Sequence, residues 1–305
     1  MRAGPRLLAF AAAAAVAWAG LTGGAPVAEA QAAHAADLAG PANVSAAAAE
    51  LVNAATGQPL WTRNMNVERP IASITKVMTA LVVIQAGQLT RTIKVSRAAE
   101  SYGRSFDPTE AGLHPGDLLT TRQILEGLLL PSASDAAYLL ATTYGPGRAA
   151  FVRKMNAEAR KLGMTRTHFA NFDGLPYPTE HSTYSTAHDL MLLARAAMRQ
   201  ATFRQIVKQR HHLITATRQH HRYYWTNTDL LLSRYQGAIG IKTGFTTGAG
   251  YCLLFAANRD GKELIGVVLG STRTNPNTRF TAAANALTWG FAAAGRQLPA
   301  SYLTR

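Results

Sequence analysis

The sequence is most informative in one stretch, Pro70-Ile71-Ala72-Ser73-Ile74-Thr75-Lys76-Val77-Met78-Thr79. This stretch predicts a helix that begins near Ser73 and turns an apolar face toward a core through Val77, Met78, Leu81 and Val82. Ser73 and Lys76 form an S-x-x-K pattern, and residues three positions apart on a helix share one face. The amino group of Lys76 is therefore expected to reach the hydroxyl of Ser73.

Outward from this helix, strands are predicted near both ends of the chain. Residues 44–64 are typical of two strands around a turn at Ala55-Thr56-Gly57-Gln58. Three apolar runs separated by turn residues predict antiparallel strands at residues 237–245, 250–257 and 263–271. The remaining segments predict helices. The first is capped by Thr120 with Gln123 and ended by Pro131, and another is marked by Phe151, Met155 and Leu162 and ended by Gly163. Three more are predicted at residues 135–144, 185–198 and 277–293.

These elements predict an α/β fold of the α+β type. One antiparallel sheet is formed from both chain ends, helices flank it, and a helical lobe is inserted between its two halves. Because active sites commonly lie between such parts, the catalytic residues are expected in the cleft between the lobe and the sheet.

Two further short motifs follow the S-x-x-K pattern along the chain. Ser132-Ala133-Ser134 lies in the break between two predicted helices, and Lys242-Thr243-Gly244 lies on the first C-terminal strand. Each motif alone is weak, since S-x-x-K also fits a helix cap followed by a solvated lysine, and K-T-G fits an ordinary strand end. Their order, spacing and structural settings together are far more specific.

The three motifs suit nucleophilic catalysis by a serine. A serine hydroxyl is a poor nucleophile unless a neighbouring base takes its proton, and a lysine becomes such a base when burial and a second cation lower its pKa. Lys242 is a candidate for that second cation, and Ser132 for passing a proton from Lys76 to the leaving group. The helix start at Ser73 offers backbone N–H groups to a developing oxyanion.

The sequence resembles the penicillin-binding proteins, and within them the low-molecular-mass D-alanyl-D-alanine carboxypeptidases of serine peptidase family S11. The resemblance covers about residues 43–291, nearly all of the chain after the leader. Segments that are similar to the family, besides the three motifs, are Leu129-Leu130-Pro131, Asp135-Ala136-Ala137, Met155-Asn156, Leu162-Gly163-Met164, Thr167-His168-Phe169, Gly174-Leu175, Tyr184-Ser185-Thr186-Ala187 and Phe245-Thr246.

This resemblance implies a penicillin-binding protein or β-lactamase-like fold and an acyl-enzyme reaction on peptidoglycan stem peptides ending in D-Ala-D-Ala. Ser73 would be the nucleophile, Lys76 the general base and Ser132 the proton shuttle. Lys242 and Thr243 would bind the terminal carboxylate of the substrate, and the backbone N–H groups of Ser73 and Phe245 would form the oxyanion hole. β-Lactam antibiotics would be covalent inhibitors, and no metal or organic cofactor is implied.

The sequence departs from the family pattern at two places. Ser134 stands where the family usually has asparagine, and a single hydroxyl cannot donate and accept as an amide does, so substrate binding at Ser134 is expected to be altered. Many members continue into a small β-rich domain and an amphipathic anchor, whereas this chain stops soon after the last predicted helix. The protein is therefore expected to be soluble once exported.

Other activities remain open with the same residues. A DD-endopeptidase or transpeptidase would use the same acyl-enzyme, because the shape of the cleft decides the acceptor. A class A β-lactamase is less favoured, since residues 167–175 contain only Asp173 where those enzymes hold water with a glutamate. A non-catalytic peptidoglycan-binding relative is disfavoured, because binding alone does not require the Ser73–Lys76 pair.

Charge and the N-terminus indicate the compartment. The chain has 305 residues, 48% hydrophobic and 16% charged, with a net charge of +14. Such a balance favours polyanions, and anionic cell-envelope polymers are preferred as partners over nucleic acid, for which no motif is present. Arg2 and Arg6 precede an apolar run at residues 7–21, shorter than the roughly 20 residues that span a bilayer, and Ala28-Glu29-Ala30 matches a signal-peptidase site.

The predicted organisation is therefore a signal peptide at residues 1–30, a disordered leader at 31–42, the catalytic domain at 43–293 and a tail at 294–305. The mature protein is expected outside the cytoplasm, as a periplasmic, cell-wall-associated or secreted protein. Cys252 is expected to be buried and unpaired. The pairs His211-His212 and His220-His221 fit no metal-ligand spacing, and no Cys or carboxylate joins them in sequence, so they predict a solvated basic segment.

Overall fold

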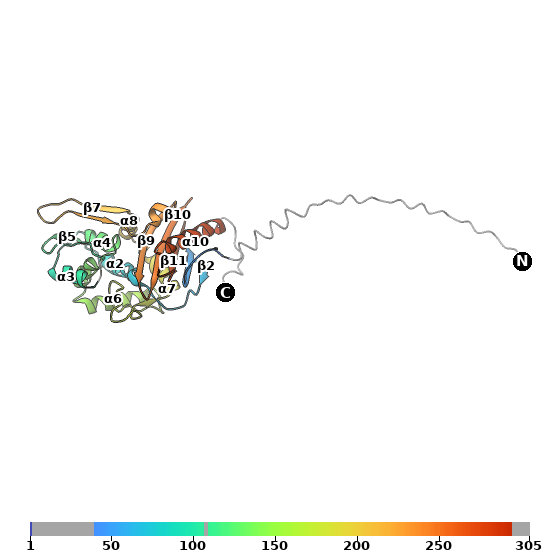
Figure 1. Ribbon diagram of the computed structural model, residues 1–305, viewed down its shortest axis with the longest axis horizontal. Coiled ribbons are helices and arrows are strands. Elements are labelled where there is room, and N and C mark those ends of the chain that lie inside the picture. Colours follow the sequence, from blue (N-terminus) through green and yellow to red (C-terminus); the bar gives the residue numbers. More distant parts are fainter. Residues whose placement is uncertain (2–39, 107–108, 295–305) are drawn as a thin grey trace. The chain divides into compact units, whose positions relative to one another are not determined.

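Five antiparallel strands form the central sheet, and both ends of the described chain contribute to it. The computed structural model describes residues 40–106 and 109–294, together with Met1. Apart from Met1 and Ala294, the predicted signal peptide and tail lie outside these residues, as does most of the leader. The order of the strands (Figure 1) is β2 (Pro59–Arg63), β1 (Ala48–Asn53), β11 (Lys262–Leu269), β10 (Gly250–Arg259) and β9 (Ala238–Thr246). The predicted sheet formed from both chain ends is confirmed.

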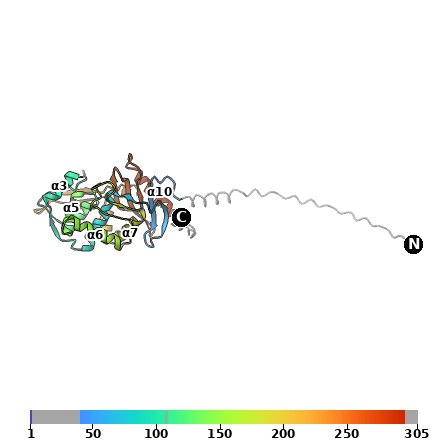
Figure 2. The same ribbon diagram turned by 90° about the horizontal axis from the view of Figure 1, so that it is seen from below.

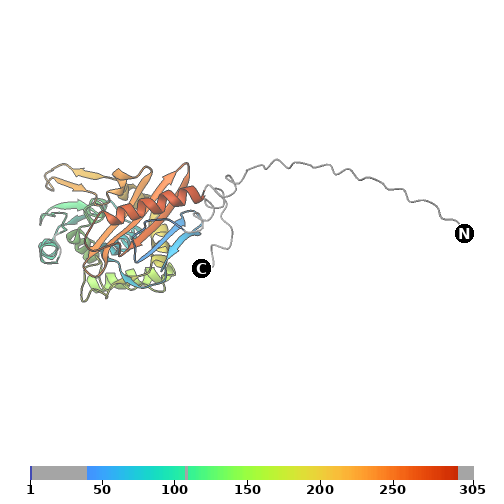
Figure 3. The same cartoon turned by 45° about the vertical axis from the view of Figure 1, so that its right-hand side comes forward.

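Alternate residues of these strands face two different cores. Leu253, Phe255 and Leu264 pack with helix α10 (Thr278–Ala294), whereas Leu254 and Ile265 pack with the helical lobe. The side-chain period of two in a strand produces this division, because successive residues point to opposite faces. Figure 3 shows α10 lying across its face of the sheet, and Figure 2 shows α3, α5 and α6 on the other side of the sheet from α10.

The helix predicted at Ser73 lies at the centre of the lobe. It consists of a 3-10 turn, η1 (Ala72–Ile74), followed by α2 (Thr75–Ala86), and nine of the twelve residues of α2 are buried. The sequence predicted burial of one apolar face only. The helix is buried on all sides because it contacts five other helices, α4 (Thr121–Leu129), α5 (Ser134–Tyr144), α6 (Arg148–Lys161), α7 (Ala187–Met198) and α8 (Ala201–Val207).

The remaining elements connect these helices. The capping box predicted at Thr120 and Gln123 is present, and α4 ends at Leu129 before Pro131. Among the described residues, no helix combines the length and the apolar character that crossing a membrane requires.

The shorter elements are the strand pairs β3 (Arg69–Pro70) with β6 (Tyr184–Ser185), β4 (Thr92–Lys94) with β5 (Leu118–Thr120) and β7 (His211–Ile214) with β8 (Tyr223–Thr226), and the helices α3 (Arg97–Phe106) and α9 (Leu231–Arg234).

The histidine-rich segment is largely exposed, as predicted, but it also makes contacts that the sequence did not predict. It forms the hairpin β7–β8, and two of its histidines contact buried carboxylates: His212 Nε2 lies 2.9 Å from Glu126 Oε2, and His221 Nδ1 lies 2.9 Å from Asp117 Oδ1. Most of the segment is nonetheless exposed, including His211 and His221, so the prediction of a solvated segment is confirmed. The two carboxylate contacts were not predicted, because both carboxylates come from residues far away in the sequence. Within the described ranges, no group of three or more potential ligands could hold a metal ion.

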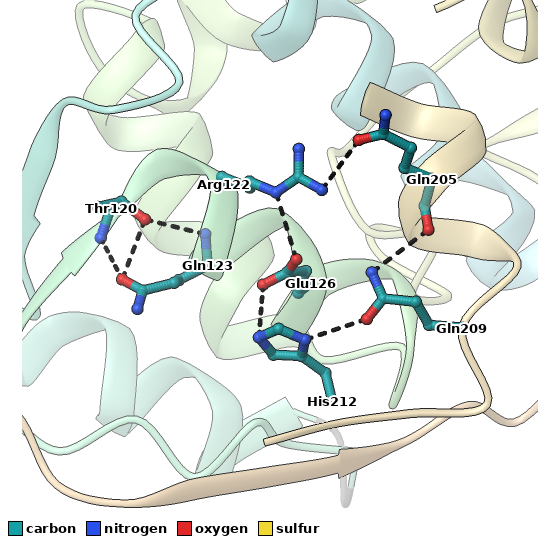
Figure 4. Close-up of polar contacts among 7 residues, drawn as sticks. All are labelled: Thr120, Arg122, Gln123, Glu126, Gln205, Gln209 and His212. Carbon is teal, nitrogen blue, oxygen red and sulfur yellow. Dashed lines mark hydrogen bonds and ion pairs between the residues drawn. The ribbon is translucent and has the colours of Figure 1, made fainter. Parts of the chain in front are cut away.

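Glu126 connects the hairpin to helix α4 (Figure 4). Its carboxylate also lies 3.5 Å from Arg122 Nε, and Arg122 Nη2 donates to Gln205 Oε1 on α8 at 3.2 Å. Nδ1 of His212 lies 3.0 Å from Gln209 Oε1. Burial raises the pKa of Glu126, although the charges of His212 and Arg122 act to lower it. The carboxylate therefore joins α4 to the hairpin directly, and to α8 through Arg122.

Replacing Glu126 by alanine is expected to lower the free energy of unfolding by about 2 kcal/mol, because His212 and Arg122 lose a shared buried acceptor. Urea denaturation near neutral pH measures the change. Gln205→Ala serves as the control, since it removes only the contact with the outer end of Arg122, and it should cost about 0.5 kcal/mol or less. Equal losses for the two variants would contradict a central role for Glu126.

Candidate active site

Ser73 and Lys76 are in direct contact, as the S-x-x-K pattern predicted. Lys76 Nζ lies 3.0 Å from Ser73 Oγ and donates to the backbone carbonyl oxygen of Asp173 at 2.9 Å. The Lys76 side chain is 0% exposed, whereas Ser73 is only partly buried. The pair therefore combines a reachable hydroxyl with an amino group shielded from solvent, which is the setting that activates a serine.

The turn before α2 holds Ser73 in place. Ala72 adopts a left-handed conformation with φ +47°, and its carbonyl oxygen accepts a hydrogen bond from Thr75 Oγ1 at 2.8 Å. Gly174 packs against this turn so closely that a Cβ there would lie 1.9 Å from the Ala72 oxygen. On the neighbouring helix turn, Thr79 Oγ1 donates to Phe172 O at 2.5 Å. The loop that contains Asp173 therefore packs tightly against the start of the helix.

Ser132 lies between α4 and α5, where the sequence predicted it, and Ser134 lies at the start of α5. Ser132 is 6% exposed and has a left-handed backbone with φ +71°, which is uncommon for a residue with a side chain. Ser134 is the first residue of α5 and is fully buried. The next residue, Asp135, anchors the neighbouring loop, because its carboxylate accepts hydrogen bonds from the N–H groups of Ala111, Leu113 and Ala136 at 3.0, 3.1 and 2.7 Å.

The third motif lies on β9 with its polar side chains buried. Lys242 is 1% exposed and Thr243 is 5% exposed, and Lys242 Nζ donates to the Thr243 carbonyl at 3.1 Å. Phe245 is exposed, and its ring stacks on Tyr251 of β10 at 4.3 Å between centroids. The strand therefore presents an aromatic rim next to a buried cation.

Close packing and one hydroxyl connect the three motifs. A Cβ at Gly244 would lie 3.0 Å from the carbonyl oxygen of Ile71, so β9 runs against the turn that carries Ser73. Thr228 joins the second motif to the third: its N–H donates to Leu130 O at 3.1 Å, and its Oγ1 lies 2.6 Å from Thr243 Oγ1. Sequence reasoning missed Thr228, because no motif surrounds it.

Arg279 is a second cation that the sequence did not identify. It comes from α10, and its Nη1 donates to the Gly244 carbonyl at 3.2 Å. Burial lowers the pKa of Arg279, and its guanidinium lies 5.0 Å from the centre of the Tyr251 ring. The helix containing Arg279 was predicted, but only the packing of that helix on the sheet brings the side chain to the K-T-G strand.

The arrangement suits acyl transfer by a serine. A hydroxyl with a buried amine beside it can attack a carbonyl. Two cations on the K-T-G side suit a substrate that carries a carboxylate.

The comparisons with known proteins agree with this geometry. The family model described as D-alanyl-D-alanine carboxypeptidase, Peptidase_S11, matches residues 31–273. A D-alanyl-D-alanine carboxypeptidase of Streptomyces sp. (strain K15) is 41% identical over 261 residues, which cover 82% of this chain and 88% of the relative. D-alanyl-D-alanine carboxypeptidase DacB2 of Mycobacterium tuberculosis is 39% identical over 238 residues, which cover 78% of this chain and 79% of the relative.

Solved structures show the same similarity. The crystal structure of the Streptomyces K15 DD-transpeptidase matches with a TM-score of 0.77 and 39% identity, covering 82% of this chain and 98% of that one. A D-alanyl-D-alanine carboxypeptidase from M. tuberculosis H37Rv matches with a TM-score of 0.74 and 37% identity, covering 83% of this chain and 92% of that one. The predicted penicillin-binding protein-like fold is confirmed.

Gly174→Ala is expected to disturb the Ser73 turn, since the added methyl group would overlap the Ala72 carbonyl. The loss of unfolding free energy should be about 3 kcal/mol, and reaction of Ser73 with an acylating probe should slow at least about tenfold. The matched control is Gly261→Ala, which has a similar φ of +75° but no atom within 4 Å of the new methyl group. It should cost about 1 kcal/mol and leave Ser73 reactivity unchanged. Similar effects at both glycines would show that backbone strain, and not contact with the turn, is responsible.

Proposed function

Because the chain belongs to the D-alanyl-D-alanine carboxypeptidase family, peptidase family S11, we propose that it is a serine-type D-Ala-D-Ala carboxypeptidase. It removes the terminal D-alanine from peptidoglycan stem peptides through an acyl-enzyme. The observation that carries the proposal is the buried Lys76 amino group, 3.0 Å from Ser73 Oγ.

Acylation begins with attack of Ser73 Oγ on the carbonyl carbon between the two D-alanines. Lys76, in its neutral form, takes the hydroxyl proton as the new C–O bond forms. The tetrahedral oxyanion is held by the backbone N–H groups of Ser73 and Phe245. Ser132 passes the proton from Lys76 to the leaving nitrogen, the C–N bond breaks, and D-alanine departs. Water then attacks the ester by the reverse proton route and releases the shortened peptide.

The K-T-G side binds the end of the substrate. Lys242 supplies a positive charge and Thr243 a hydroxyl to the terminal carboxylate, and the position of Arg279 on Gly244 supports a second charge there. A β-lactam has a carbonyl in place of the scissile bond and a carboxylate in place of the D-alanine terminus, so it acylates Ser73 in the same way.

Ser134 is the residue at which substrate binding differs from the usual family pattern. In place of an asparagine amide, one hydroxyl contacts the substrate backbone. The loss of one hydrogen bond is worth about 1 kcal/mol, which corresponds to roughly tenfold in rate. The enzyme is therefore slow but active.

The proposed activity requires export, because peptidoglycan lies outside the cytoplasmic membrane. Its sequence support is the predicted signal peptide at residues 1–30, which lies outside the described residues. The net charge of the full chain, +14, supports an association of the protein with anionic polymers of the cell envelope.

A second candidate is DD-transpeptidase activity, in which an amine replaces water as the acceptor. The observation that favours it is the similarity to the Streptomyces K15 protein, which is named both D-alanyl-D-alanine carboxypeptidase and DD-transpeptidase. The acyl-enzyme on Ser73 is common to both reactions, so only the second step distinguishes them.

A fluorescent penicillin is expected to label the wild-type protein covalently, and Ser73→Ala should abolish both the label and the release of D-alanine from a D-Ala-D-Ala peptide. Gel fluorescence and a D-alanine assay measure the two effects. Ser101→Ala, at an exposed position of α3, is the control and should behave as wild type. Labelling that persists in the Ser73→Ala protein would refute the assignment of the nucleophile.

Competition between water and an amine is expected to favour water. With the same peptide and an excess of glycine, mass spectrometry should detect mainly the hydrolysed peptide and less of the glycine-extended product. A dominant glycine-extended product would instead make transpeptidation the principal activity, while leaving the acyl-enzyme step intact.

A further inference from the structure

Asp229 is a buried acid behind the K-T-G strand. It lies between β8 and α9, is 2% exposed, and its Oδ1 accepts a hydrogen bond from the Leu231 N–H at 3.0 Å. Among the described residues, its Oδ2 atom is buried without any hydrogen-bond partner. A buried carboxylate oxygen is costly to leave unpaired, so the second oxygen requires an explanation that the local turn does not give.

The segment around Asp229 is rigidly held against the candidate site. Asn227 fixes it by donating from Nδ2 to Val207 O at 3.1 Å and to Gln209 O at 2.9 Å, while its Oδ1 accepts the N–H of Asp229 at 2.9 Å. The residue between them, Thr228, is the one whose hydroxyl contacts Thr243. Asp229 is therefore not free to turn toward solvent.

Two cations act on Asp229 from two different elements, Lys242 of β9 and Arg279 of α10. The third neighbouring element, α9, contributes only the Leu231 amide. Cys252 of β10 also acts on Arg279, but burial raises the pKa of its thiol to about 11, so it carries no charge near neutrality. The charged groups around Asp229 are thus the same two cations that face the substrate carboxylate in the proposed function.

The contact of the adjacent Thr228 with Thr243 places Asp229 beside the K-T-G strand, and we propose that its charge makes recognition of the substrate carboxylate by Lys242 and Arg279 depend on pH. The proposal rests on the proposed function, since it assigns the two cations to the carboxylate. Asp229 does not touch the substrate in this scheme. It acts by offsetting one of the two positive charges behind the binding site.

The direction of the effect follows from the titration of the buried acid. Burial raises the pKa of Asp229 to about 6, against the lowering effects of the Leu231 amide, Lys242 and Arg279. Below that pH, Asp229 is neutral, and the side chains of Asp229, Lys242 and Arg279 together carry two positive charges. Above it, Asp229 is ionised, and the net charge of the three side chains is one positive charge. A carboxylate ligand is therefore held more tightly at pH 5 than at pH 7.5, whereas an uncharged ligand is not.

The experiment compares a penicillin that has its free carboxylate with the methyl ester of the same penicillin. The second-order rate constants for acylation of Ser73 by the two probes are measured at about pH 5 and about pH 7.5, and their ratio is taken at each pH. An effect of pH on the attack of Ser73 itself is common to both probes and cancels in the ratio. For the wild-type protein, the acid-to-ester ratio is expected to fall about fivefold between the two pH values.

Asp229→Asn should give the same ratio at both pH values, equal to that of the wild type at low pH. The control is Glu126→Gln, which changes another buried carboxylate of raised pKa away from the two cations, and it should retain the wild-type fall. If the Asn protein does not fold, Asp229→Ser replaces it, since a hydroxyl still offers an acceptor to Leu231 without a charge.

Three results would overturn the inference. The first is a wild-type ratio that does not change with pH. The second is a fall of the acid-to-ester ratio between the two pH values that persists in Asp229→Asn or Asp229→Ser. The third is a ratio that is lowered equally at both pH values in those variants, which would mean that Asp229 only supports the shape of the site. Failure of both probes to acylate the wild-type protein would instead refute the proposed function.

Discussion

A lysine amino group buried at the centre of the lobe must be given hydrogen-bond acceptors, and the surroundings of Lys76 meet this requirement. Its acceptors include the hydroxyl of Ser73 and the carbonyl of Asp173. Supplying the carbonyl brings a distant loop against the start of α2, and only a glycine at position 174 fits there. The loop is held in turn by Tyr102, whose hydroxyl donates to Asp173 Oδ2 at 2.8 Å. The hydrogen bond that satisfies the Lys76 amino group is therefore also a contact that packs the Asp173 loop against α2.

The sheet provides the other half of the site by the same kind of close contact. Strand β9 passes the Ser73 turn at Gly244, and Thr228 joins it to the loop that carries Ser132. Because each motif is connected to the next through backbone atoms or short side chains, little rotamer freedom remains to be lost when a substrate binds. On the far face of the sheet, α10 contacts the same strand through Arg279, which donates to the Gly244 carbonyl.

Local signals in the sequence predicted much of this structure. The capping box, the proline and glycine stops and the alternating strands gave most helices and all five sheet strands close to their observed bounds, and the family relationship is confirmed. Contacts between distant residues were not predictable from such signals. Examples are the carboxylates that hold His212 and His221, the carbonyl of Asp173 and the approach of Arg279. The catalytic and binding roles of Ser73, Lys76, Ser132 and the K-T-G residues stay predictions.

The position of β11 in the sheet has a consequence for biosynthesis. This strand lies between β1 and β10, and it pairs with β1 along Ala48↔Leu269 to Asn53↔Leu264. During translation, β1 and β2 emerge early but have no third strand until residues 262–269 have been made. An early hairpin of two strands is only marginally stable and leaves an open edge. The sheet is thus completed only when almost the whole chain is available, and a product truncated before β11 would present that edge to other chains.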